Sequence, residues 1–263
     1  MKIKNVSKLM TLTFLLVLLL LGGCGSKTEG TASDKEKLVN DGKLTYAMSG
    51  LLKPLNYKDN GKLVGFDVEI GAEIAKRIGL KANPVTNPWE TIIQGLKGKK
   101  YDAIIGSMTA TPERAKQVDF TDPYYISGAQ IFVAKSNNSI NSAEDLKNKK
   151  IGIMQASTYK EIADKYTKDV KNYPSDVYAL QDLVPGRVDA VITDKIVGVS
   201  AIKQEGIQIK TAGDLLRKEN ISIAVNKDNP VLLKKINKAI KEMVDDGTYE
   251  KISNKWFGEN VLK

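Results

Sequence analysis

Apolar residues along the chain follow two patterns: short continuous runs, and longer segments with an apolar residue at about every fourth position. The segment GFDVEIGAEIAKRI (65–78) has the second pattern, which places its apolar residues on one face of a helix. The segment 103–105 has the first pattern, which is typical of a buried strand. The chain therefore carries the signals of both helices and strands.

These two patterns predict the order of the elements. The predicted strands are 43–48, 82–85, 103–105, 128–134, 150–154, 170–173, 189–193, 207–209 and 221–225. The predicted helices are 65–78, 87–98, 143–146, 157–166, 175–184, 195–204 and 230–256, the last with a break at Asp246-Gly247. Asn87 can cap the second of these helices, with Pro88 at its first position. Strands that alternate with helices of this length indicate an α/β fold with a largely parallel sheet.

The order of elements repeats, which indicates two similar lobes. Each half reads strand, helix, strand, helix, buried strand, and the buried strand carries Asp-Ala-Ile-Ile at 102–105 and Asp-Ala-Val-Ile at 189–192. We expect the chain to cross between the lobes near 128–135 and to return near 221–228. Both segments are apolar strands suited to a hinge.

The N-terminal segment indicates the compartment. Residues 1–8 carry three lysines and no acid, and 9–21 is an apolar run of about 13 residues, the length of a signal-peptide core and shorter than a membrane span. The run ends in Leu21-Gly22-Gly23-Cys24, which resembles the lipobox of bacterial lipoproteins, where the cysteine is lipidated and becomes the new N-terminus. Cys24 is the only cysteine, which excludes an intramolecular disulfide. A signal peptide with an incidental cysteine is the alternative.

These observations divide the chain into a signal peptide (1–23), a lipidated tether (24–36), lobe 1 (37–129 plus 226–263) and lobe 2 (130–225). The formal net charge is +9, and removal of the three lysines of the signal peptide leaves +6. The lysines are spread over predicted helix faces, so we expect no nucleic-acid partner. The chain has no histidine, which excludes histidine-based triads and most zinc sites, and we expect no metal or other cofactor.

The segment YDAIIGSMTATPERAKQVDFTDPYY (101–125) is the candidate binding site. Its buried strand is followed by small and hydroxylated residues and then by Pro112 and Arg114. Small residues let a backbone approach a ligand, the helix start offers free N–H groups, and an arginine offers a planar fork of donors for a carboxylate. We interpret the segment as a binding site for a small anionic group. An ordinary strand–turn–helix with a surface arginine is the alternative.

Several motifs, in one order over roughly residues 40 to 258, resemble those of the polar amino-acid solute-binding proteins of ABC importers. They are Gly65-Phe66-Asp67-Val68-Glu69-Ile70, Trp89-Glu-Thr-Ile-Ile, Asp102-Ala-Ile-Ile-Gly-Ser-Met-Thr with Pro112-Glu-Arg114, Asp119-Phe120-Thr-Asp-Pro-Tyr-Tyr125, and Gly186-Arg-Val-Asp-Ala with Asp194. The resemblance implies a two-lobed periplasmic-binding-protein-like fold (type II) with the ligand in the interlobe cleft. It also implies a monomeric receptor, held by lipid on the extracytoplasmic face of the cell membrane, that delivers a free amino acid to the transmembrane subunits of an ABC permease.

The resemblance further implies roles for single residues. Arg114 takes the position of the arginine that clamps the α-carboxylate, and Asp194 that of the aspartate that holds the α-ammonium. The other positions expected at the carboxylate are Ser107, Thr109, Ser157 and Thr158. Two alternatives stay open. Asp194 could cap the helix that follows it, and Arg114 could pair at the surface with Asp119 or Glu113.

The expected walls of the side-chain pocket are Trp89, Leu52 and Met154, although Trp89 could instead belong to the core. Leu52 stands where the family often has an aromatic residue, and Ser49 where an acid often stands when the ligand side chain is cationic. We therefore expect an uncharged amino acid. The leucine-rich wall and the run Tyr124-Tyr125-Ile-Ser-Gly suggest cystine or another sulfur amino acid.

A second interpretation is an enzyme on the same scaffold, a dehydratase of the cyclohexadienyl or arogenate type. Such chemistry needs a cleft group that donates a proton near neutral pH. The chain has no histidine, and Glu90, the acid nearest to Trp89, fits an exposed first-turn residue favoured by the helix dipole. We therefore expect a receptor and no enzyme.

Overall fold

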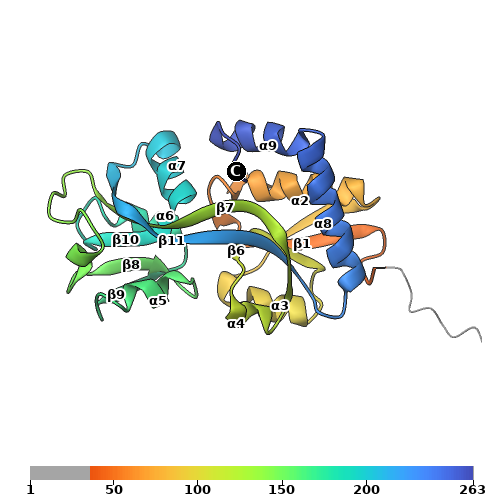
Figure 1. Ribbon diagram of the computed structural model, residues 1–263, viewed down its shortest axis with the longest axis horizontal. Coiled ribbons are helices and arrows are strands. Elements are labelled where there is room, and N and C mark those ends of the chain that lie inside the picture. The colour runs from red at the N-terminus through yellow and green to blue at the C-terminus, as the bar shows by residue number, and fades with distance from the viewer. Residues whose placement is uncertain (1–35, 263) are drawn as a thin grey trace, which may run out of the picture. The chain divides into compact units, whose positions relative to one another are not determined.

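Two long antiparallel strands, β7 (Asp119–Ala134) and β11 (Ile209–Val225), run side by side through the middle of an eight-stranded sheet (Figure 1). The computed structural model describes residues 36–262. The expected signal peptide, the lipidation site at Cys24 and nearly all of the tether lie outside the described residues.

The other strands flank this central pair and divide the fold into two lobes. Across the sheet, the strands beyond β11 are β6 (Ala103–Thr109), β1 (Lys43–Met48) and β5 (Lys81–Thr86). On the other side, the strands beyond β7 are β10 (Ala190–Asp194), β8 (Ile151–Met154) and β9 (Val170–Tyr173). Within each lobe the flanking strands pair in parallel, as predicted. The pairings that involve β7 and β11 are antiparallel, so the sheet as a whole is mixed rather than largely parallel.

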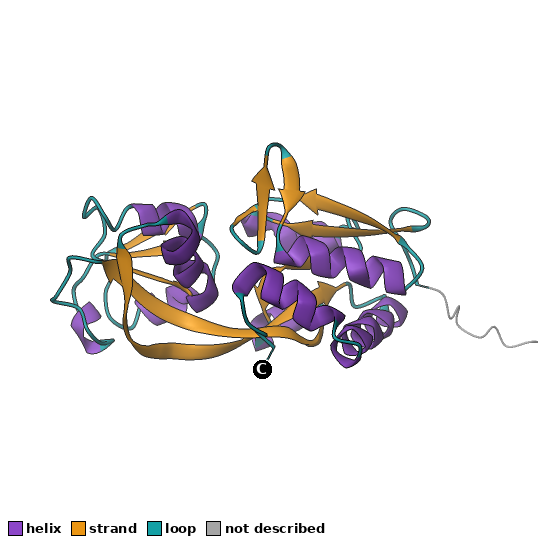
Figure 2. Cartoon of the chain, turned by 90° about the horizontal axis from the view of Figure 1, so that it is seen from above, coloured by secondary structure: helices purple, strands orange, loops and turns teal. Residues whose placement is uncertain are grey.

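The helices cover the two lobes separately. The first lobe holds α2 (Phe66–Arg77), α3 (Ile92–Lys97), α4 (Pro112–Ala115), α8 (Pro230–Asp245) and α9 (Thr248–Phe257), and the second holds α5 (Tyr159–Ala163), α6 (Asp176–Gln181) and α7 (Lys195–Glu205). Short 3₁₀ turns lie at Trp89–Thr91 and Glu144–Leu146. The C-terminal helices α8 and α9 pack on α2, so the chain ends on the lobe in which its described part begins (Figure 2). Within 36–262, no helix has both the length and the apolar character needed to cross a bilayer.

The crossing strands differ most from the prediction. The strand β11 begins at the last residue of the predicted 207–209 and continues without a break through the predicted 221–225, and β7 begins at Asp119, ahead of the predicted 128. The pairing of β11 with β7 shifts register between Ala212 and Arg217, so the residues between them form a bulge. The polar segment after that bulge reads as a loop in the sequence, but its backbone pairs with β7 and continues the strand.

Three local features also differ from the prediction. The segment after β1, for which the sequence analysis gives no strand, forms a small antiparallel sheet of β2 (Leu51–Leu52), β3 (Asn56–Asp59) and β4 (Lys62–Val64). Asn87 does not cap a helix, because its side-chain amide donates to Pro88 O at 2.8 Å and to Thr91 Oγ1 at 3.0 Å. The helix predicted at 157–166 is limited to Tyr159–Ala163.

Candidate ligand-binding site

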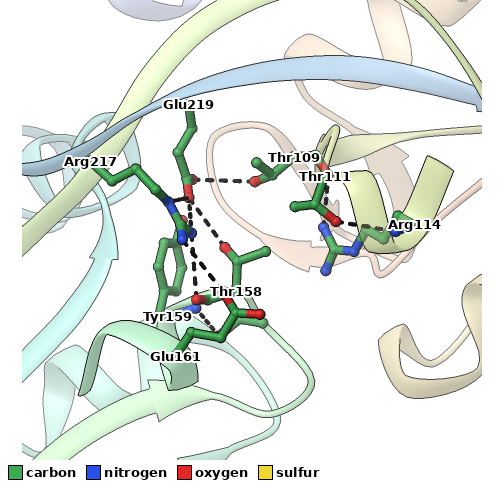
Figure 3. A network of polar contacts seen from close by, with 9 residues as sticks. Thr109, Thr111, Arg114, Thr158, Tyr159, Glu161, Arg217 and Glu219 are labelled. Carbon is green, nitrogen blue, oxygen red and sulfur yellow. Dashed lines mark hydrogen bonds and ion pairs between the residues drawn. The ribbon is translucent and has the colours of Figure 1, made fainter. Parts of the chain in front are cut away.

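Three of the polar residues expected to bind a ligand, Thr109, Arg114 and Thr158, come from both lobes and lie near the crossing strand β11 (Figure 3). Thr109 ends β6 and Arg114 lies on α4, both in the first lobe. Thr158 lies at the start of α5 in the second lobe. Figure 3 shows the side chain of Glu219, from β11, between Thr109 and Thr158. The site thus depends on loops that follow the sheet strands of two separate lobes.

Arg114 is held by its own turn and points toward the second lobe. The hydroxyl of Thr111 accepts a hydrogen bond from the Arg114 N–H at 3.2 Å and caps α4. The guanidinium donates from Nη1 to Thr109 O at 3.0 Å and from Nη2 to Ala156 O, across the lobe junction, at 3.4 Å. Its carbon lies 5.6 Å from the centre of the Trp89 ring. These contacts use only part of the five donors of an arginine.

The guanidinium of Arg114 is only partly exposed. Burial lowers the pKa of Arg114, because desolvation disfavours the charged guanidinium. Among the described residues no carboxylate forms an ion pair with Arg114. The alternative partner Asp119 pairs instead with Lys227 at 2.9 Å. A partly buried arginine with free donors and no ion-paired carboxylate is suited to a ligand carboxylate.

Asp194 is the last residue of β10 and caps α7. Its Oδ1 accepts from Ile196 N at 2.7 Å and from Ser127 Oγ at 2.6 Å, so the capping role that the sequence left open is present in the structure. Its Oδ2 makes no hydrogen bond with any described residue. Burial raises the pKa of Asp194 to about 7, and the negative charge of Glu219 adds to the effect. The cap therefore leaves one oxygen of a buried carboxylate available.

Ser107 turns away from Arg114. It has a left-handed backbone conformation (φ 62°), and its hydroxyl donates to Asp67 Oδ2 at 2.8 Å. Asp67 is fully buried and also accepts from Tyr124 OH and from Asn56 Nδ2, both at 2.6 Å. The Ser107 backbone N–H donates to Tyr124 OH at 3.0 Å, so both the hydroxyl and the N–H of Ser107 are used inside the first lobe.

The hydroxyls of Thr109 and Thr158 meet at one carboxylate. Thr109 Oγ1 donates to Glu219 Oε2 at 3.2 Å, and Thr158 Oγ1 donates to Glu219 Oε1 at 3.2 Å. Ser157 lies beside them, and its Oγ accepts from Tyr159 N at 3.4 Å at the start of α5. The structure thus brings Arg114, Thr109 and Thr158 together, and it uses the Ser157 hydroxyl in the turn before α5.

Glu219 and its neighbour Arg217 are the residues that the sequence interpretation missed. The Glu219 side chain is 1% exposed, and its Oε1 lies 2.5 Å from Arg217 Nη2. The signal that could have found the pair is its spacing, because residues two apart on a strand point to the same face. The sequence does not reveal this spacing as a strand pattern, because the charged segment around Arg217 and Glu219 has the composition of a loop.

The expected apolar walls lie where the lobes touch. Trp89 and Met154, from different lobes, belong to one buried cluster with 8% and 9% of their surface exposed. Leu52 is also buried, on β2, which packs against α6 of the other lobe. A cavity of about 300 Å³ lies beside Trp89 and is lined also by Ser49, Leu51, Glu90 and Pro174. Trp89 therefore contacts the guanidinium of Arg114 and also borders this cavity.

Two α/β lobes joined by paired crossing strands, with polar residues of both lobes converging at the junction, define a two-lobed solute-binding protein. The sequence profile of the bacterial extracellular solute-binding proteins, family 3, matches residues 44–259, and the chain belongs to that family.

Named relatives agree with this assignment. The L-cystine-binding protein TcyJ of Escherichia coli (strain K12) is 34% identical over 248 residues, which is 93% of each chain. The solved structure of an ancestral arginine-binding protein bound to glutamine is 44% identical with a TM-score of 0.78, and the match covers 84% of this chain and all of that one. An ancestral amino acid-binding protein described as a precursor of cyclohexadienyl dehydratase is 35% identical with a TM-score of 0.76, over 82% of this chain and 95% of that one. These relatives carry the names of binding proteins, and this chain is likewise a binding protein and not an enzyme.

Proposed function

We propose that the protein is the receptor of an ABC importer for a free amino acid, held by a lipid on Cys24 at the extracytoplasmic face of the cell membrane. The lobes, 37–129 plus 226–263 and 130–225, close on the ligand and present it to the transmembrane subunits of the permease. A signal peptide (1–23) and a tether (24–36) precede them. The relatives named for cystine and arginine support an amino acid as the ligand class.

The proposal rests mainly on the partial burial of Arg114 and on its lack of an ion pair among the described residues. A guanidinium that is partly buried at the lobe junction and forms no ion pair with a carboxylate of residues 36–262 can take a ligand carboxylate as its partner. Asp194 offers the opposite charge, with one carboxylate oxygen still unbonded to described residues. An α-amino acid carries both complementary groups. It pairs fully only when the two lobes close, which gives a physical reason for closure.

The side-chain pocket of this receptor is the space beside Trp89, Leu52 and Met154. The cavity of about 300 Å³ next to Trp89, whose lining includes neither Leu52 nor Met154, lies at the small end of the range for ligand pockets. Ser49 lines it, at the position where an acid often stands when the ligand side chain is cationic. Glu90 and Lys58 line it as well, one acid and one base, both at exposed positions. These features favour an uncharged amino acid, with cystine or another sulfur amino acid as the leading candidate.

A thermal-shift screen tests the proposal. Residues 36–263 form one compact unit, so the chain from Gly25 onward is suitable, screened against the twenty L-amino acids and L-cystine. A ligand at 100 times its Kd adds about 2.7 kcal/mol of unfolding free energy, which raises Tm by roughly 5–10 °C in a chain of this size. A shift with neutral amino acids supports the proposal. A shift with basic amino acids only contradicts the neutral pocket, and no shift at all contradicts the receptor.

A further inference from the structure

We propose that Glu219 determines the hydrogen-bonding direction of two hydroxyl groups at the ligand site, those of Thr109 and Thr158. By accepting the hydroxyl protons of Thr109 and Thr158, it makes both hydroxyls acceptors toward the cleft and so selects a ligand that carries an ammonium group. This inference rests on the proposed function, because it concerns the same interlobe site.

The position of Glu219 is specific. Its carboxylate accepts from one threonine of each lobe, with both O···O distances at 3.2 Å, although the residue itself belongs to the crossing strand (Figure 3). Arg217 donates to the same carboxylate from Nη2 at 2.5 Å and from Nε at 3.0 Å, which stabilises its negative charge. Both carboxylate oxygens are therefore occupied inside the protein, and the side chain is almost completely buried.

The consequence follows from hydrogen-bond chemistry. An ionised carboxylate can only accept, and a hydroxyl has a single proton to donate. The proton of each threonine is therefore directed at Glu219, and each hydroxyl presents only lone pairs to any other group. A ligand carboxylate would meet those lone pairs unfavourably, and it must be held by Arg114 and by backbone N–H groups. An ammonium group would find acceptors in the threonine hydroxyls and in the unbonded oxygen of Asp194.

This role differs from a purely structural one. A structural ion pair between Glu219 and Arg217 would affect stability and the affinity for every ligand alike. A residue that sets hydroxyl polarity affects the discrimination between a ligand with an ammonium group and the same ligand without it. The ratio of the two dissociation constants is thus the decisive readout.

The experiment compares wild type with Glu219→Gln, because the amide has the same shape but can donate to the threonine hydroxyls. The probes are L-cystine, L-arginine and L-glutamine, each with its des-amino counterpart: 3,3′-dithiodipropionic acid, 5-guanidinopentanoic acid and glutaramic acid. Glu161→Gln is the matched control, because Glu161 is 79% exposed and lies 3.8 Å from the same arginine but does not bond the threonines. Dissociation constants come from calorimetry, and Tm reports on folding.

For at least one probe we expect wild type to bind the amino acid about 100-fold more tightly than its des-amino counterpart. Glu219→Gln should reduce that ratio at least about tenfold, through weaker binding of the amino acid, whereas Glu161→Gln should preserve it. If Glu219→Gln has a wild-type ratio, the inference is wrong while the receptor proposal stands. If wild type binds neither these three amino acids nor any other amino acid of the thermal-shift screen, the receptor proposal fails and the inference fails with it.

A second variant keeps the test decisive if Glu219→Gln does not fold. Thr109→Val removes a hydroxyl but keeps the shape and the backbone N–H of the residue. The inference predicts that this variant loses discrimination through weaker binding of the amino acid. An unchanged ratio in Thr109→Val would overturn it.

Discussion

The guanidinium of Arg114 lies over the indole ring of Trp89, with 5.6 Å between the guanidinium carbon and the ring centre. Trp89 is almost fully buried in a cluster that also contains Met154 of the other lobe, so packing holds the ring in place. A fixed aromatic face attracts the cation and limits the orientations of its donors. Trp89 thus belongs to the core and, through Arg114, also to the candidate site.

The first prediction concerns this contact. Trp89→Phe should weaken amino-acid binding about 2- to 30-fold, because phenylalanine has a smaller aromatic face for the Arg114 cation. Trp89→Ala should also lower the unfolding free energy by about 3–5 kcal/mol, because it leaves a cavity in a buried cluster. Calorimetric titration and thermal denaturation measure the two effects.

The control for this prediction is Trp256 on α9. It also lies under a cation, with Lys255 Nζ 5.3 Å from its ring centre, but it packs against Tyr57 rather than Arg114. Trp256→Phe should leave the affinity unchanged. Equal losses of affinity in Trp89→Phe and Trp256→Phe would show that the contact with Arg114 has no specific role.

The second prediction concerns the pH dependence of stability. Burial raises the pKa of Asp194 to about 7, compared with about 3.9 in the unfolded chain, so between these values the native state binds a proton that the unfolded state releases. The unfolding free energy should therefore fall as the pH rises from about 4 to about 7. Asp194→Asn should make the profile flatter, and since asparagine also caps helices, the cap itself is kept. Chemical denaturation at a series of pH values measures this.

The same titration should affect binding, because an ammonium group pairs with the ionised form of Asp194. We expect the affinity for the amino acid to fall by up to about tenfold per pH unit as the pH drops below about 7, with release of a proton on binding. Calorimetry in buffers of different ionisation enthalpy counts that proton. An affinity independent of pH between 5.5 and 8 would contradict the role of Asp194 at the ammonium group.

The third prediction concerns the membrane anchor. When the full chain is expressed in a bacterium, Cys24→Ala should move the protein from the membrane fraction to the soluble fraction and should abolish metabolic labelling by a palmitate analogue. The reason is that a covalently attached lipid provides membrane affinity that the polar segment after Cys24 lacks. Persistent membrane association of the variant without label would indicate that the N-terminal apolar run remains attached instead.

The sequence predicts those elements whose signals are local. The strands at Lys43–Met48 and Val170–Tyr173 have the predicted bounds, and the C-terminal helices divide at the predicted Asp246-Gly247 break. The helix α8 begins where expected because Asn229 caps it, accepting from Leu232 N, and Pro230 occupies its first turn. In each case a short stretch of sequence decides the structure.

The crossing strands and Glu219 are not predictable in this way. Pro123 and Gly128 interrupt the apolar pattern of β7, and the charged segment of β11 looks like a loop, yet each strand is stabilised by pairing with the other. The partners of Glu219, Thr109 and Thr158, lie 110 and 61 residues away in sequence. Arg114 and Asp194 could be proposed as candidates from motifs, but the internal use of the Ser107 hydroxyl by Asp67 depends on a left-handed conformation that sequence pattern does not reveal.

The most direct test of the interlobe site is the amino-acid screen repeated with Arg114→Ala, beside wild type and Arg187→Ala. Arg187 is 67% exposed and pairs with Asp182 on the second lobe, so its removal takes away an arginine without touching the site. We predict that at least one amino acid raises the Tm of wild type and Arg187→Ala, and that Arg114→Ala binds it roughly 30-fold or more weakly. An equal shift in Arg114→Ala, or no shift in wild type with any amino acid, would contradict the account.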